Sequence, residues 1–258
     1  MPTKKAKTLT GKTLRRMLIG LLPVLAAGVA IPLAGAADNS KIKAVRLIQR
    51  HHYFGDTETV ISLNGVRINN LGGMRFKLAA KAPDWRFCIY RDDDKTIFLN
   101  SFQWLKQNGI VNNFLVKERD EYYPKKLPIR ESNFSGFKIK WIKSGEETCE
   151  YLPLANIAPP QAESILYAVY KMPTNGGIPV RLNKPAPTVD WLSGSDKGRH
   201  HRDLFNTSKI EATLVDKDYF DTPLNFQPVK SVLEVLTSKA KRDASGALDE
   251  LFESGRKH

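Results

Sequence analysis

Hydrophobic and polar residues alternate along the chain from Val45 to Asn100, a pattern typical of strands with one buried face. Residues 59–63 and 66–69 flank Asn64-Gly65, a dipeptide that favours a two-residue hairpin turn. Residues 74–78, 86–90 and 96–99 continue the pattern, with turn residues between them. The region therefore predicts an antiparallel meander.

Helical spacing replaces this alternation in three places. Ser101 precedes a short helical run that stops at Asn108-Gly109, and Pro159-Pro160 begins a second one that ends near Lys171. Residues 229–239 are amphipathic and predict a third helix.

Further strands are predicted at residues 137–142, 148–152, 178–182 and 208–215. Pro179 favours an edge position for the third of these. Residues 118–135 and 183–203 are rich in polar residues, and each contains proline, so both are predicted to be long loops.

These elements predict the α+β class, dominated by a curved antiparallel β-sheet with short helices packed on one face. The expected organisation is a leader at residues 1–37, a single β-rich domain at residues 38–240, and a helical or frayed tail at residues 241–258.

The leader has the three parts of a secretory signal peptide. Six basic residues precede the uncharged run from Met17 to Ala37, which ends in small residues at Ala34-Gly35-Ala36. Cleavage is expected near Ala36, which would place the mature protein in the periplasm or outside the cell. An uncleaved membrane anchor is the alternative, and Arg15-Arg16 leaves both the general secretory and the twin-arginine export routes open.

The leader also carries six of the chain's thirteen net positive charges, which leaves +7 for the remainder. Because those charges are interspersed with acidic residues in an exported protein, no nucleic-acid partner is expected. An envelope or membrane surface suits the remaining basic excess better.

Cys88 and Cys149 are the only cysteines. In an oxidising compartment they can form a disulfide, which the chain-entropy model values at roughly 4 kcal/mol for a loop of this length. Because each lies in an apolar run, two buried free thiols are the alternative.

The sequence contains only weak motifs for metal binding or catalysis. One histidine each from His51-His52 and His200-His201, with Asp203, would provide a three-ligand zinc set, but the fixed short spacing of such sites is missing. The acidic run at residues 92–94 lacks the spacing and glycine of a calcium loop. No Gly-x-Ser-x-Gly elbow is present. We therefore predict no catalytic residue, metal site or cofactor.

An aromatic set is the candidate lining of a ligand cavity between sheet and helices. It consists of Trp85, Phe87, Tyr90, Phe98, Phe102, Trp104 and Trp141. A closed core filled by the same side chains is the alternative interpretation.

The order of these elements resembles the periplasmic lipoprotein-carrier superfamily of LolA type and its exported relatives. The residues that carry the resemblance are at positions 65–68, 82–87, 94–98 and 220–226, the last of which contains a Phe-x-x-Pro segment. The resemblance covers roughly Val45 to Val235 and implies a half-open barrel whose concave face takes acyl chains. It assigns no individual ligand-binding residue.

The predicted function is that of a non-enzymatic envelope protein that binds a hydrophobic ligand, a lipid or an acylated partner, between sheet and helices. The alternatives are a structural or protein-interaction module of the envelope with a closed core, and a hydrolase with a dispersed site.

Overall fold

The computed structural model describes residues 40–110, 123–124, 127–155, 157–189, 196–241 and 243, with the backbone alone described for 185–189 and 196–202. The predicted leader and most of the predicted tail lie outside these residues. The strands are β1 (Lys41–His51), β2 (Gly55–Ser62), β3 (Gly65–Asn70), β4 (Phe76–Lys81), β5 (Phe87–Arg91), β6 (Thr96–Asn100), β7 (Ile129–Phe134), β8 (Phe137–Ser144), β9 (Glu147–Pro153), β10 (Gly177–Val189), β11 (Asp196–Asp216) and β12 (Gln227–Pro228). The helices are α1 (Phe102–Asn108), α2 (Pro160–Tyr170) and α3 (Val232–Leu236).

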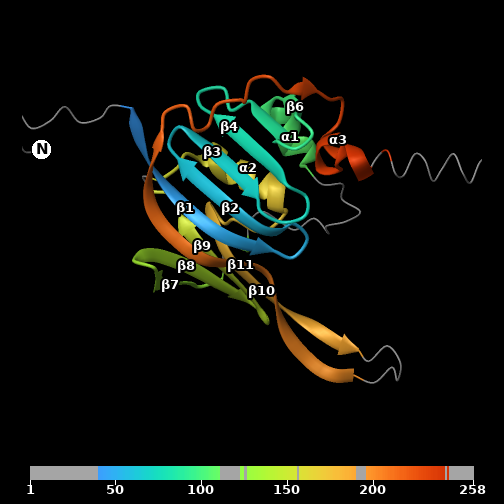
Figure 1. Cartoon of the computed structure of the whole chain (residues 1–258). Coiled ribbons are helices and arrows are strands. Elements are labelled where there is room, and N and C mark those ends of the chain that lie inside the picture. Colours follow the sequence, from blue (N-terminus) through green and yellow to red (C-terminus); the bar gives the residue numbers. More distant parts are fainter. Residues whose placement is uncertain are drawn as a thin grey trace, which may run out of the picture. The chain divides into compact units, whose positions relative to one another are not determined.

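All these strands belong to one open sheet, in the order β12-β6-β5-β4-β3-β2-β1-β11-β10-β9-β8-β7 (Figure 1). Neighbouring strands are antiparallel, except that the two-residue β12 runs parallel to β6. Strands β1 to β6 follow one another in both sequence and space. The predicted antiparallel sheet and its meander are confirmed.

Strand register divides the side chains between two faces. A central row crosses seven strands and consists of Ile210, Leu47, Thr59, Ile68, Leu78, Ile89 and Phe98. Its apolar members share one buried cluster with α1, α2 and α3. We call this the inner face and the opposite one the outer face.

Helix α2 is apolar around most of its circumference, which is typical of a helix buried on several sides. Ile165, Leu166 and Val169 are at most 1% exposed. Pro160 stands in its first turn, where the missing backbone donor costs nothing. The predicted start is confirmed.

Helix α1 also begins and ends as predicted. The Ser101 hydroxyl accepts a hydrogen bond from the Trp104 amide, and Gly109 closes the helix at a φ of 65°.

Residues 217–229, which we call the strap, follow β11 and contact the outer face. Phe220 packs against Gly65, and Phe226 packs against Tyr90 with ring centroids 5.3 Å apart. Val232 and Val235 of α3 then join the inner-face cluster. The C-terminal part of the described chain thus contributes to both faces.

Three predictions about the second half were wrong. Residues 183–203 are not simply a loop, because β10 and β11 continue as a two-stranded ribbon past the ends of β9 and β1 (Figure 1). Strand β10 is not an edge strand, since it lies between β9 and β11 and a register shift accommodates Pro179. Part of the predicted loop at 118–135 forms the edge strand β7.

Candidate functional site

At the end where β1 begins, the outermost described side chains of the inner-face rows are exposed. Three rows of cross-strand neighbours lead toward that end: Thr59, Leu47 and Ile210, then Ile61, Val45 and Ala212, then Leu63, Lys43 and Leu214. Leu63 lies two residues after Ile61, which belongs to the last β1–β2 pair at this end, and is part of the hairpin turn.

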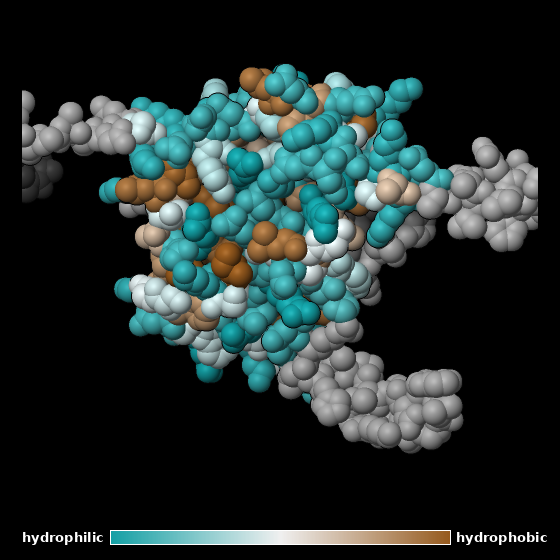
Figure 2. Space-filling view, viewed as in Figure 1, coloured by the Kyte–Doolittle hydropathy of each residue, from teal (hydrophilic) through white to brown (hydrophobic). Residues whose placement is uncertain are grey.

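Exposure rises along these rows. Leu47 and Ile61 are fully buried, Val45 is 7% exposed, and Leu63 and Leu214 reach 57% and 60%. Two large apolar side chains in the outermost row are therefore open to solvent. Figure 2 shows hydrophobic residues in brown among the hydrophilic ones on the side of the molecule turned to the viewer.

A pocket of about 410 Å³ lies at this end of the sheet, lined by Val45 and Ile157 of the inner-face cluster and by Ala44 of the cluster on the other face. Its lining comes from the start of β1, the β2–β3 turn, β11 and the loop before α2: Ile42, Lys43, Ala44, Val45, Ser62, Leu63, Asn64, Ile157 and Ala212. The lining is mainly aliphatic, with Lys43 as its one charged member. We call it the rim pocket. Its size and apolar character fit a small hydrophobic ligand.

A buried polar network lies at the opposite end of the inner face and fixes the C-terminal end of α2. The Tyr170 hydroxyl is 2.9 Å from Oγ1 of Thr59 and 3.4 Å from that of Thr57. Nε2 of His51 lies 3.3 Å from the Tyr170 carbonyl oxygen. Helix α2 is thus tied to β1 and β2 at the end far from the rim pocket.

His51 is neutral in this network. Its Nδ1 accepts hydrogen bonds from the Tyr53 and Phe54 amides, so Nε2 carries the proton and donates to Tyr170. Burial lowers the pKa of His51 to about 4. Because the ring is fully buried, it has a structural role.

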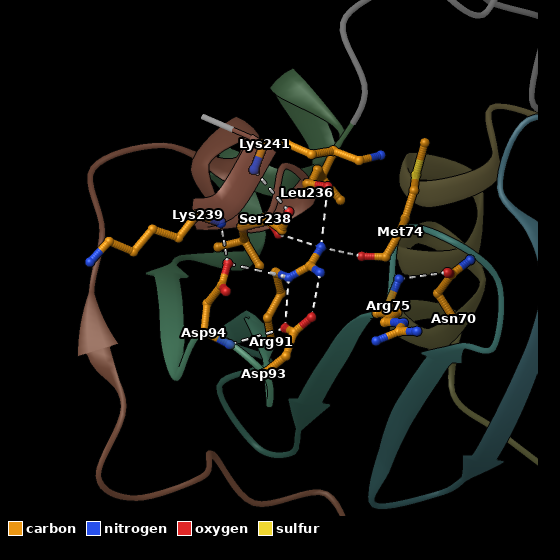
Figure 3. A network of polar contacts seen from close by, with 11 residues as sticks. Asn70, Met74, Arg75, Arg91, Asp93, Asp94, Leu236, Ser238, Lys239 and Lys241 are labelled. Atoms are coloured by element: carbon orange, nitrogen blue, oxygen red, sulfur yellow. Dashed lines mark hydrogen bonds and ion pairs between the residues drawn. The ribbon is translucent and has the colours of Figure 1, made fainter. Parts of the chain in front are cut away.

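A second pocket, of about 370 Å³, adjoins Arg91, whose polar contacts are drawn in Figure 3. The Arg91 guanidinium donates two hydrogen bonds to the Asp93 carboxylate, at 2.7 and 2.9 Å, and others to the carbonyl oxygens of Met74 and Leu236. These bonds lower the pKa of Asp93. Arg91 is 3% exposed and is held by protein groups, so it joins β5 to the end of α3.

The structure separates the predicted aromatic set into three places. Phe87, Phe98 and Trp104 pack against one another with centroids 5.1–6.1 Å apart, and Trp85 and Phe102 join the same inner-face cluster. Tyr90 is on the outer face, where Arg67 donates a hydrogen bond to its hydroxyl. The Arg130 guanidinium carbon lies over Trp141, 5.0 Å from the centre of the indole ring.

Cys88 and Cys149 are both buried free thiols. Cys88 is on the outer face, in the cluster that contains Tyr90, whereas Cys149 belongs to the inner-face cluster. Because the sheet separates them, the candidate disulfide does not form in this structure. Burial raises the pKa of the Cys88 thiol, which keeps it protonated.

The structure describes the candidate zinc ligands only in part, because the side chains of His200 and His201 lie outside the described ones. His51 is used within the core, and His200 and His201 stand on the β10–β11 ribbon opposite Ala186 and Pro185. Asp203 accepts a hydrogen bond from Asn183 at 2.9 Å. Among the described residues, no three metal-ligating side chains are grouped closely enough to hold an ion.

The acidic run at residues 92–94 forms the turn between β5 and β6 and pairs with basic residues. Arg91 holds Asp93 and Asp94, and Lys77 pairs with Asp92.

Neither the family models nor the curated proteins compared with this chain give a match. Within the part of the chain that the structure describes, no helix is long and apolar enough to cross a membrane.

The rim-pocket residues were not singled out from the sequence. The one available signal was position: Leu63 lies in a turn, and Ala212 and Leu214 continue the inner-face alternation of β11 past Ile210. Sequence alternation shows which face these side chains occupy but not where the covering layer ends.

Proposed function

We propose that this chain is an exported, non-enzymatic protein of the cell envelope that binds the acyl chain of a lipid or acylated partner in the rim pocket. One observation carries the proposal: the aliphatic rows of the inner face end in the exposed Leu63 and Leu214, and Leu63 lines a mainly apolar pocket. An apolar pocket of this size with an exposed leucine at its edge is a candidate ligand site.

Burial of acyl surface would supply the binding free energy, at about 0.8 kcal/mol for each methylene removed from water. The buried row of Val45 and Ile61 lies directly behind the exposed row. A chain laid along the pocket would therefore extend the existing core. In this proposal the strongly curved sheet acts as a half-open barrel with its mouth at the rim pocket.

The aromatic interior has a different role in this proposal. Phe87, Phe98 and Trp104 are in ring contact with one another. They form the packed floor on which the helices rest, and the ligand enters at the aliphatic end.

The leader supports the proposed location. Its basic start and uncharged run are typical of export, and the +7 charge of the remainder suits a protein that works beside anionic lipid headgroups.

Displacement of a fluorescent fatty-acid analogue tests the proposal. Ala212 is exposed, so Ala212→Trp fills the pocket without crowding the core, and Leu63→Asp places a charge on its edge. Leu71→Asp is the matched control, because Leu71 is 59% exposed and does not line the pocket.

We expect both pocket variants to weaken binding by about tenfold or more, which corresponds to ~1.4 kcal/mol or more. The Leu71→Asp variant should bind like the original chain. Absence of binding by the original chain would favour the alternative of an envelope interaction module. Equal binding by all four proteins would place the ligand elsewhere.

A further inference from the structure

The rim pocket carries one positive charge and no acidic side chain in its lining. Lys43 is its only charged member, and Ser62 and Asn64 are its neutral polar ones. Lys43 is exposed, and within the described residues it forms no ion pair. Its neighbour on the same face of β1 differs, because Lys41 pairs with Asp216 at 3.5 Å.

Lys43 also stands at the solvent edge of the pocket. It occupies the outermost row, with Leu214 opposite it on β11 and Leu63 toward β2. Val45 lies one step inward and is nearly buried. An ammonium group at the edge and aliphatic side chains behind it form an amphipathic site.

We propose that the ligand of the rim pocket is a free single-chain amphiphile with an anionic headgroup, such as a fatty acid, whose headgroup pairs with the Lys43 ammonium. This inference rests on the proposed function and specifies its ligand. The chain lies against Val45, Ala212 and Ile157, and the headgroup remains at the solvent edge beside Lys43.

Charge and size both favour this ligand over others. A cationic headgroup would be repelled by Lys43, and a neutral one would gain no charge pair with it. The pocket volume of about 410 Å³ lies toward the small end of the range for ligand pockets, which suits one chain.

Binding of matched amphiphiles tests the inference. Dodecanoate and 1-dodecanol share one chain length and differ in headgroup charge, and both are titrated calorimetrically below their aggregation concentrations at pH 7.5. The proteins are the original chain, Lys43→Gln, Lys43→Glu and Lys138→Gln. Lys138 is an exposed lysine on β8 outside the pocket, so its variant controls for net charge.

We expect the original chain and Lys138→Gln to bind dodecanoate about fivefold more tightly than dodecanol, the size of a partly exposed charge pair. Lys43→Gln should bind the two equally. Lys43→Glu is also titrated with the cation dodecyltrimethylammonium. It should prefer this cation to dodecanoate, which a merely destabilised variant would not do.

The outcomes separate this inference from the proposed function. Equal binding of dodecanoate and dodecanol by the original chain would overturn the anionic headgroup and leave the acyl site intact. A preference for dodecanoate that survives in Lys43→Gln would also overturn the inference. Binding of neither compound would overturn both proposals.

Discussion

At the scale of single residues, His51 shows how a motif that is typical of metal ligands becomes part of a core. Its two ring nitrogens are used by the amides of Tyr53 and Phe54 and by the Tyr170 carbonyl. An adjacent histidine pair is ambiguous in sequence, because alternation places one ring on each face. Only the assembled sheet shows that His51 faces α2.

The pH dependence of stability follows from this burial. The pKa of His51 falls from 6.5 to about 4 on folding, so the unfolded chain binds the proton more readily between these values. The stability that depends on His51 being neutral is fully present above pH 6.5 and is lost as the pH falls toward 4. Over this range the free energy of unfolding falls by about 3 kcal/mol on account of His51.

Urea unfolding between pH 7.5 and 4.5 measures this effect. His51→Gln should be less stable at pH 7.5 and should lose less stability on acidification than the original chain. His52→Gln, at an exposed neighbour, should retain the original slope. Equal slopes for the His51 variant and the original chain would show that His51 titrates normally.

Gly65 illustrates a residue whose identity is explained by packing. The Asn64-Gly65 dipeptide predicted a turn, but the turn residues are Leu63 and Asn64, and Gly65 begins β3. A Cβ atom at Gly65 would lie 2.5 Å from Cγ of Phe220 and 2.7 Å from the carbonyl oxygen of Ala80. The strap therefore requires glycine there, a contact that local sequence does not show.

At the scale of elements, strands with local partners were predictable and strands with unusual composition were not. Alternation identifies most of the meander, because each of its strands pairs with the next one along the chain. The ribbon of β10 and β11 contains Pro185 and Pro187 opposite basic residues, so composition alone favours a loop. Edge strand β7 has almost no buried side chain and so lacks alternation.

The attachment of α3 to the sheet depends on Arg91. Its guanidinium joins the turn after β5 to carbonyl oxygens at the end of α3 (Figure 3). Arg91→Gln would leave buried acceptors without donors, and we expect a loss of roughly 2–4 kcal/mol in the free energy of unfolding. Amide hydrogen exchange in α3 should accelerate.

Arg75→Gln is the control for this prediction, because Arg75 is exposed and lies beside the same network (Figure 3). It should leave both stability and exchange in α3 nearly unchanged. If Arg91→Gln altered stability while α3 exchanged at its original rate, Arg91 would not be the anchor of that helix.

At the scale of the whole molecule, the two ends of the inner face differ in which side chains they bury. One end buries the polar side chains of His51 and Thr57 against Tyr170 of α2, and the other leaves Leu63 and Leu214 exposed. The fold class and the apolar face were predictable from the sequence. The rim pocket was not, because it depends on where the loop before α2 stops covering the sheet.

Native mass spectrometry of the full-length protein purified from its own host, without detergent, tests the central claim most directly. The account predicts a species with one bound anionic single-chain amphiphile on the original chain and its loss in Ala212→Trp. A mass with no adduct on the original chain, or the same adduct retained by Ala212→Trp, would contradict it.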